Sequence, residues 1–472
     1  MFGLRDERKA IFQGALLLLI LALGLGIALL PLQWAGALVL GGVIFLLTAI
    51  RPAWGLYFLA FAVPFGSLYE VQVQAFRVGL TEALVGLALA AWLARMAALR
   101  RVHIPRPPLL FPLLLFLGAT LLSWLGAFSL AHSVKESVKW AEVVGIYLLV
   151  ASLEESGAER RWLALCLLAA GCAQALLGFY QFFGRVGPEH FLLFERFMRA
   201  YGTFEQPNPY AGYLGLVLPL AYGLFLTRLT APLERRVVFL PALAFYGLCL
   251  SVMGAAMVMS WSRGAWLGAA AALVVVSVAR SRRAALLFGG MAVLLLFLAF
   301  LGSLNLLPEF ISQRFADVLP YLRPFDVREV EVSPENWAVV ERMAHWQAGW
   351  EMFSAHPWLG VGFGNYAPIY PAYALPGWDE PLGHAHNYYL NLAAETGLVG
   401  LAAYLLFWGA SLREGWRAVR CSSGFAQGVA LGVLGVLAHL TVHNFFDNLY
   451  VHGMYVHFAM LLGLVAGAQR QR

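Results

Sequence analysis

Long apolar runs, separated by short polar segments, recur along almost the whole chain. Each run approaches the roughly 20 residues that an α-helix needs to cross the hydrocarbon core of a bilayer. The pattern predicts an all-α fold, a polytopic integral membrane protein with about 14 transmembrane helices. The predicted spans are residues 10–30, 34–50, 53–66, 79–98, 109–128, 138–153, 162–183, 209–227, 237–257, 264–279, 285–303, 386–409, 425–443 and 449–467.

Composition and charge agree with a membrane location. The chain is 61% hydrophobic and 12% charged, against roughly 25% charged residues in soluble domains. Its net charge of +6 does not indicate nucleic-acid binding, because the basic residues cluster between the apolar runs. Most Lys and Arg fall in alternate connecting segments, and the positive-inside rule makes those segments cytoplasmic. Both termini are therefore expected in the cytoplasm.

Two longer polar segments fall on the opposite, outer side. They divide the chain into residues 1–303, transmembrane helices with an outer loop at 184–208; residues 304–385, a long extracytoplasmic loop over the active site; and residues 386–472, the C-terminal transmembrane helices. Within the long loop, "ERMAHWQAGWEMF" (341–353) carries Trp346, Trp350 and Phe353 at helical spacing. This spacing predicts an amphipathic helix on the membrane or over a cavity.

The last outer segment leads into the membrane through "GHAHNYYLNLAAETGLVG" (383–400), which is unusually polar. Four of its residues are spaced to share one face of a continuous helix: His384, Tyr388, Asn391 and Glu395. Such a stripe can simply pair with a neighbouring helix. His386 and Asn387 stand at the mouth of the span, where Asn can serve as a helix cap and His as a general base.

Arginines at the outer side are the second candidate feature. Arg263 opens a span in "SWSRGAWLG" (260–268), where Gly264 and Gly268 are expected to allow close helix packing. Arg263 either extends to the lipid headgroups or faces inward, where its planar donors would bind phosphate. Arg199 precedes a Pro-rich helix start, and that turn does not explain its charge. Together with Arg342 and the two histidines, these cations suggest a phosphate-bearing substrate and proton transfer.

Two further motifs resemble ligand-binding patterns. The glycine-rich "PWLGVGFGNY" (357–366) has no preceding strand and no following Lys-Ser/Thr, so we interpret it as a tight turn rather than a nucleotide-binding loop. His439 and His443 are one helical turn apart, with Asp447 nearby, and such a pair can bind a metal or haem. No acidic or thiol ligand pattern accompanies the pair, so no metal is expected.

Several of these motifs, in this order and topology, resemble the O-antigen ligase and polymerase family of bacterial envelope proteins. The motifs are "GTFEQPNPYAGY" (202–213), "SRGAWLG" (262–268), "PWLGVGFGNY" (357–366) and "HNYYLNLAAETGLVG" (386–400). The resemblance runs from about residue 199 to about residue 460. Members of this family commonly have twelve spans, which makes 12 the alternative count.

The resemblance implies a function. Family members transfer a glycan from undecaprenyl pyrophosphate to an acceptor hydroxyl of a glycan, lipid or protein, at the periplasmic face of the bacterial inner membrane, without a cofactor or metal. Carried over by motif, His386 is the catalytic base and Arg199 and Arg263 bind the pyrophosphate, with Arg342 as an additional cation. His384, Asn387, Tyr388, Asn391 and Glu395 are supporting residues. The helical-face argument alone favours His384 as the base.

Three alternatives remain open. An O-antigen or exopolysaccharide polymerase would use the same donor and the same motifs. A secondary transporter for an anionic solute is a rival from another class, although transporters usually bind their substrates near the bilayer midplane between repeats. A haem- or metal-handling protein rests on the pair His439 and His443 alone.

Overall fold

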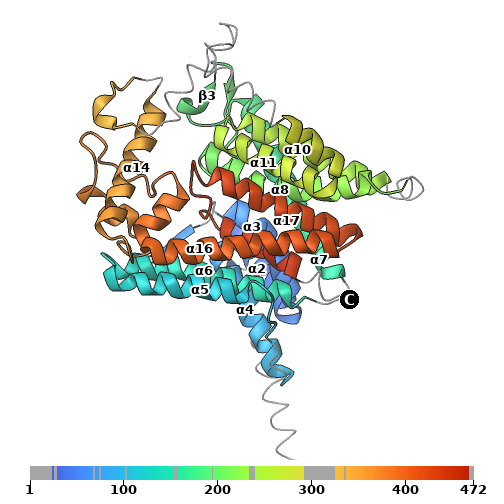
Figure 1. Cartoon of the computed structure of the whole chain (residues 1–472). Coiled ribbons are helices and arrows are strands. Elements are labelled where there is room, and N and C mark those ends of the chain that lie inside the picture. Colours follow the sequence, from blue (N-terminus) through green and yellow to red (C-terminus); the bar gives the residue numbers. More distant parts are fainter. Residues whose placement is uncertain are drawn as a thin grey trace, which may run out of the picture.

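A computed structural model describes residues 24–25, 29–66, 70–73, 76–100, 104–153, 157–193, 195–232, 240–291, 325–333 and 336–466. Within these residues the fold is a bundle of helices, as predicted (Figure 1). In this described part of the chain, eight helices are long and apolar enough to cross a membrane: α2 (Leu32–Ile50), α4 (Leu80–Ala98), α7 (Ala158–Gly184), α8 (Pro207–Leu229), α10 (Leu240–Met259), α11 (Arg263–Arg280), α16 (Tyr388–Cys421) and α17 (Gly424–His443). The chain is therefore an all-α polytopic membrane protein.

Shorter apolar helices coincide with other predicted spans. They are α3 (Pro52–Phe65), α5 (Leu110–Leu122) with the 3-10 turn Ser123–Gly126, and α18 (Met454–Ala466). The span predicted at 138–153 belongs to α6 (Leu130–Ala151), which starts earlier because the charged turns at its beginning are also helical. Most of the predicted spans 10–30 and 285–303 lies outside the described residues.

The centre of the bundle is formed by α8 and α17, which pack along one another, with α11 and α10 on one side (Figure 1). A side-chain carbon at Gly223 of α8 would overlap with the backbone of α17 at Gly428 and Gly432. Small residues at such crossings let helix backbones approach closely, which compensates for the weak hydrophobic drive between helices in lipid. On the other side, α6 packs against α18 and α5.

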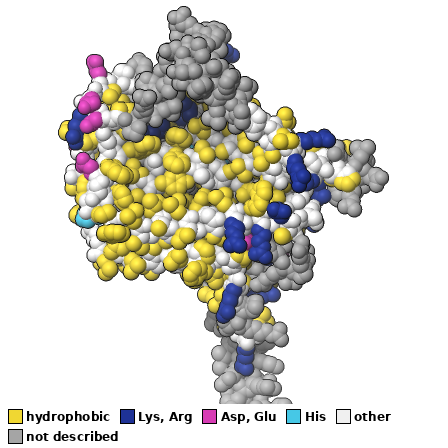
Figure 2. All heavy atoms as spheres, in the orientation of Figure 1, with side chains coloured by type: hydrophobic (Ala, Val, Ile, Leu, Met, Phe, Trp, Pro, Cys, Tyr) yellow, Lys and Arg dark blue, Asp and Glu magenta, His cyan; other side chains and the backbone are white. Residues whose placement is uncertain are grey.

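The surface has the character expected of a lipid-facing bundle. Figure 2 shows hydrophobic side chains over most of the described part of this face, with Lys and Arg gathered toward one end and Asp and Glu toward the end that carries α14. Exposed apolar side chains include Phe111 of α5, Leu248 of α10 and Leu406 of α16. A continuous apolar surface of this kind is a membrane-facing one.

Helix α16 is longer than the predicted span and contains a break. Gly397 has φ 62° and ψ −163°, outside helical values. The turn at 357–366 packs into this break: Val361 N–H donates to the carbonyl of Ala394, and Leu398 N–H donates to the carbonyl of Pro357, at 3.0 and 2.8 Å. The motif is a turn, as predicted. It forms hydrogen bonds with backbone groups of α16 that lack helical partners at the break.

Helix α14 (Trp337–Ala355) confirms the helix expected in the long outer segment. Its buried face consists of Val340, Met343, Ala344, His345, Ala348, Gly349 and Met352. Trp350 lies on the exposed face of the helix, and its side chain is 60% exposed. The described residues also form two small antiparallel hairpins, β1 (Glu70–Val73) with β2 (Phe76–Gly79) and β3 (Leu192–Leu193) with β4 (Phe197–Met198).

Candidate active site

A polar cavity of about 830 Å³ opens at the end of the bundle where α14 lies. Its lining comes from segments far apart in the sequence: the first turns of α6, the start of α8, α14, the loop before α16 and the turn after α17. The predicted residues that line it are Arg342, His384, His386, Tyr388, Asn391 and Glu395. The structure therefore brings the histidines and the polar stripe of α16 together in one space.

The two histidines lie in the loop just before α16, not on the helix. Asn387 is the N-cap: its side-chain oxygen accepts the backbone N–H of Leu390 at 3.1 Å. The cap interpretation of Asn387 is thus confirmed. His386 has φ 50°, a left-handed conformation that is uncommon outside glycine. Because the helix starts at Tyr388, the argument that placed His384 on the same helical face was wrong, although the loop brings His384 to that cavity.

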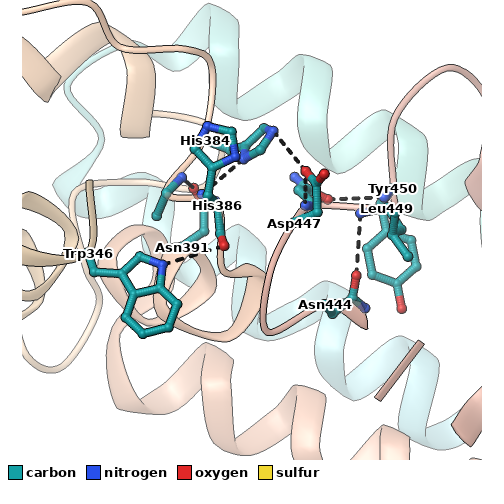
Figure 3. Close-up of polar contacts among 10 residues, drawn as sticks. Trp346, His384, His386, Asn391, Asn444, Asp447, Leu449 and Tyr450 are labelled. Carbon is teal, nitrogen blue, oxygen red and sulfur yellow. Dashed lines mark hydrogen bonds and ion pairs between the residues drawn. The ribbon is translucent and has the colours of Figure 1, made fainter. Parts of the chain in front are cut away.

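Hydrogen bonds fix the loop in this conformation. Asn391 Oδ1 accepts the backbone N–H of Ala385 at 3.0 Å, and His384 Nδ1 accepts the backbone N–H of His386 at 3.0 Å. Trp346 Nε1 of α14 donates to the carbonyl of His386 at 3.5 Å (Figure 3). Asn391 therefore supports the loop from within α16, and accepting at Nδ1 leaves the proton of neutral His384 on Nε2.

Asp447 is a functional candidate that sequence reasoning missed. Nε2 of His384 lies 3.5 Å from Oδ1 of Asp447, in the turn between α17 and α18 (Figure 3). One ring nitrogen each of His384 and His386 and one oxygen of Asp447 all lie within 4.8 Å of one another. The sequence shows Asp447 only as a neighbour of the pair His439 and His443, just after a predicted span.

Both ring nitrogens of His386 are buried and have no hydrogen-bond partner among the described residues. Burial, followed by the positive influence of His384, Arg342 and His345, lowers the pKa of His386 to about 2. Burial also lowers the pKa of His384, while the carboxylate of Asp447 opposes that shift. Both imidazoles are consequently neutral near pH 7, the form that can accept a proton.

The three predicted arginines converge on one region. Arg199 Nε donates to the carbonyl of Ser260 at 3.0 Å, which fixes it against the turn that precedes Arg263 at the start of α11. Burial, and then the charges of Arg342 and Arg263, lowers the pKa of Arg199. Arg342 also acts on His384 and His386. Arg342 lines the cavity, whereas Arg199 and Arg263 lie outside its lining.

Glu395 and Tyr388 are deeply buried at the base of the cavity. Glu395 Oε1 accepts the backbone N–H of Tyr366 at 3.0 Å, and its carbonyl accepts that of Gly362 at 3.0 Å. Through these two hydrogen bonds, Glu395 holds the turn at residues 357–366 against α16. Tyr388 packs against Tyr404 and Tyr450. Their contacts support positioning roles rather than proton transfer.

The structure brings together possible metal ligands that the sequence spacing does not reveal. Sequence spacing suggested no ligand cluster, yet His384, His386 and Asp447 form a group that could hold an ion. The pair suggested by spacing behaves differently: His443 Nδ1 lies 3.3 Å from His439 Nε2, and both rings are buried. A side-chain carbon at Gly264 would lie 2.9 Å from the ring of His443, and one at Gly268 would lie 2.7 Å from His439 Nδ1. The packing role predicted for these glycines is confirmed.

The fold and this cavity define a polytopic membrane protein with a polar site, lined by Arg342, His384 and His386, at one end of an apolar bundle. Residues 248–405 match the family model of the O-antigen ligases. The match supports the resemblance over this segment and a glycan-transferring function of the ligase type. It includes Arg263, Arg342, His384 and His386, whereas Arg199 and Asp447 lie outside it. No curated protein matches the chain significantly.

Proposed function

We propose that the protein transfers a glycan from an undecaprenyl-pyrophosphate carrier to an acceptor hydroxyl, as an O-antigen ligase of the bacterial inner membrane, with its active site facing the periplasm. The observation that carries this proposal is the position of Arg342, which lines the cavity with His386 and also acts on Arg199, the neighbour of Arg263. The basic residues gathered toward the opposite end of the bundle in Figure 2 support the orientation, with that end and both termini in the cytoplasm.

The arginines would bind the donor. A pyrophosphate presents several anionic oxygens, and guanidinium groups match them through pairs of parallel N–H bonds. Three arginines held near one another repel, so the cluster is most stable when an anion occupies it. Arg199 is fixed by its bond to Ser260, which orients its remaining donors before the substrate arrives. The undecaprenyl tail would lie among membrane lipids against the apolar surface of the bundle.

His386 would be the base. It takes the proton of the acceptor hydroxyl as that oxygen attacks the anomeric carbon of the first sugar. The bond from that carbon to the pyrophosphate breaks, and undecaprenyl pyrophosphate leaves with the electron pair. A single displacement of this kind inverts the anomeric configuration. The donor's negative charge offsets Arg342, one of the causes of the low pKa of His386, so donor binding makes His386 a stronger base.

His384 and Asp447 would support this step. The carboxylate of Asp447, 3.5 Å from His384, would stabilise positive charge that develops on the two histidines during proton transfer. His384 in turn fixes the backbone of His386. Pyrophosphate is already a good leaving group, so positioning and charge neutralisation supply most of the catalysis, and no cofactor or metal is required.

Deleting the gene and separating the surface glycans on a gel tests the reaction subtype. Lipid-linked polymer that accumulates without reaching its acceptor supports the ligase. Single repeats attached to the acceptor support the polymerase, which shares donor and motifs. An unchanged glycan profile with lost uptake of an anionic solute contradicts both and favours a transporter.

A further inference from the structure

We infer that the wall of the cavity formed by α6 is the acceptor subsite, and that Lys135 in it binds an anionic group of an acceptor saccharide. This inference rests on the proposed function and adds the class of acceptor. Lys135, Glu136 and Lys139 of α6 line the same cavity as His386 and Arg342. Their spacing places Lys135 and Lys139 one turn apart on one helix face.

The wall is held rigidly. Asn365 Oδ1 accepts the backbone N–H of Ser129 at 2.7 Å, and Asn365 Nδ2 donates to Ser133 Oγ at 2.8 Å. A side-chain carbon at Gly364, where φ is 78°, would lie 2.8 Å from the carbonyl oxygen of His132. The 357–366 turn thus fixes the first turns of α6 as well as Glu395. Such preorganisation is what a binding subsite requires.

Of the charged side chains on the α6 wall, two form an ion pair with each other and the third, Lys135, is a cation. Nζ of Lys139 lies 2.6 Å from Oε2 of Glu136, so these two charges compensate one another. Lys135 is exposed to the cavity and forms no ion pair among the described residues. A lysine binds phosphate or carboxylate as a point charge. The α6 wall therefore presents a net positive charge to whatever occupies the cavity.

Lys135 is separate from the proposed donor site. Arg199 and Arg263 belong to the side of the bundle where α11 packs on α8 and α17, whereas α6 packs on α5 and α18. In Figure 1, α11 and α6 lie on opposite sides of α16, with α14 at the end. His386 and Arg342 line the same cavity as Lys135, so a base at His386 can act on the hydroxyl of an acceptor held against the α6 wall.

The rest of the lining suits a saccharide. Glu205, Asn208 and Asn448 offer side-chain oxygens to sugar hydroxyls around the cavity. A volume of about 830 Å³ is within the roughly 300–1,000 Å³ of small-molecule sites, large enough for more than one sugar ring. An anionic saccharide, bearing phosphate or carboxylate near the accepting hydroxyl, fits both the hydroxyl partners and Lys135.

The test uses purified full-length protein, its lipid-linked donor, and the acceptor extracted from cells that lack the gene. The acceptor is used intact, or with phosphates removed by phosphatase, or with carboxyl groups amidated. We expect Lys135→Ala to raise the KM for the intact acceptor about tenfold, the loss of one charge-assisted contact, with the donor KM unchanged. Removing the recognised anion should abolish the difference between variant and wild type, and which treatment does so identifies the anion. Lys135→Arg should retain the wild-type KM.

The control is Arg328→Ala, which removes an exposed cation of the α14 region outside this cavity and should leave both KM values unchanged. An equal effect of Lys135→Ala on treated and untreated acceptors, or a rise in donor KM, overturns the acceptor subsite while leaving the transfer reaction intact. Absence of transfer by the wild-type protein overturns the proposed function itself, and the subsite with it.

Discussion

Nε2 of His384 lies 3.5 Å from Oδ1 of Asp447, and this contact joins the loop before α16 to the turn after α17. Asp447 is only 5% exposed, so its charge is poorly compensated by water. A buried carboxylate beside two neutral histidines stabilises the state in which one of them has accepted a proton. This relationship gives the site its proposed acid–base character.

Asp447→Asn therefore should lower kcat by on the order of 10², within the usual contribution of general acid–base catalysis. The amide keeps the shape but loses the charge that stabilises a protonated histidine, so the KM values for donor and acceptor should change little. Steady-state transfer assays with purified protein measure both. Asp379→Asn, which alters an exposed acid elsewhere in the 336–466 segment, is the control. A kcat close to that of wild type would remove Asp447 from the mechanism.

Arg263→Lys should weaken donor binding roughly 10- to 100-fold, because lysine keeps the charge but loses the paired donors that bind a pyrophosphate. Arg263 begins α11 and is exposed, so the substitution disturbs little packing. The donor KM and the affinity for undecaprenyl pyrophosphate are the measurements, with Arg328→Lys as the matched control. If Arg263→Ala leaves donor binding intact, Arg263 only extends to the headgroups.

Gly397→Ala should reduce the stability of the folded protein strongly, by roughly 1–3 kcal/mol or more. The added carbon would overlap with the backbone of Trp358, and φ of 62° disfavours any side chain. Gly409 lies in the same helix with nothing within 4 Å of a built side-chain carbon. Gly409→Ala should therefore be neutral or stabilising by up to about 1 kcal/mol. Thermal unfolding in detergent compares the two, and equal stabilities would contradict the packing of the 357–366 turn into α16.

Activity should survive chelation by EDTA, because the proposed mechanism neutralises the pyrophosphate with arginines. The group of His384, His386 and Asp447 makes this a real test, since these three side chains could hold an ion. Transfer rates are measured before and after exhaustive EDTA treatment and again with single divalent ions. Loss of activity that one ion restores would show that this group works as a metal centre.

The helices were largely predictable because the apolar runs of a bundle in lipid are continuous and long. The limits of α8, α11 and α17 lie within a few residues of those predicted. The start of α6 was not predictable, because a helix can extend beyond the bilayer with charged residues such as Lys135 and Glu136. Likewise, α16 continues to Cys421 because amphipathic turns follow its apolar part.

The candidate site was predictable only where a local motif exists. His386 and Asn387 stand in a recognisable pattern, and Asn387 caps α16 as its residue type suggests. The partnership of His384 with Asp447 joins two segments distant in the chain, and no local spacing encodes it. The prediction that His384 shares a helical face with Tyr388 was wrong because α16 begins only at Tyr388.

Comparing glycan transfer by His386→Ala and His384→Ala tests the central claim most directly. Both proteins are purified, checked for folding by size exclusion, and assayed with lipid-linked donor and acceptor beside His356→Ala, which alters an exposed histidine at the end of α14. If His386 is the base, His386→Ala should abolish transfer while still binding the donor, and His384→Ala should retain partial activity. Near-normal turnover by His386→Ala together with loss in His384→Ala would contradict the assignment of His386 as the base.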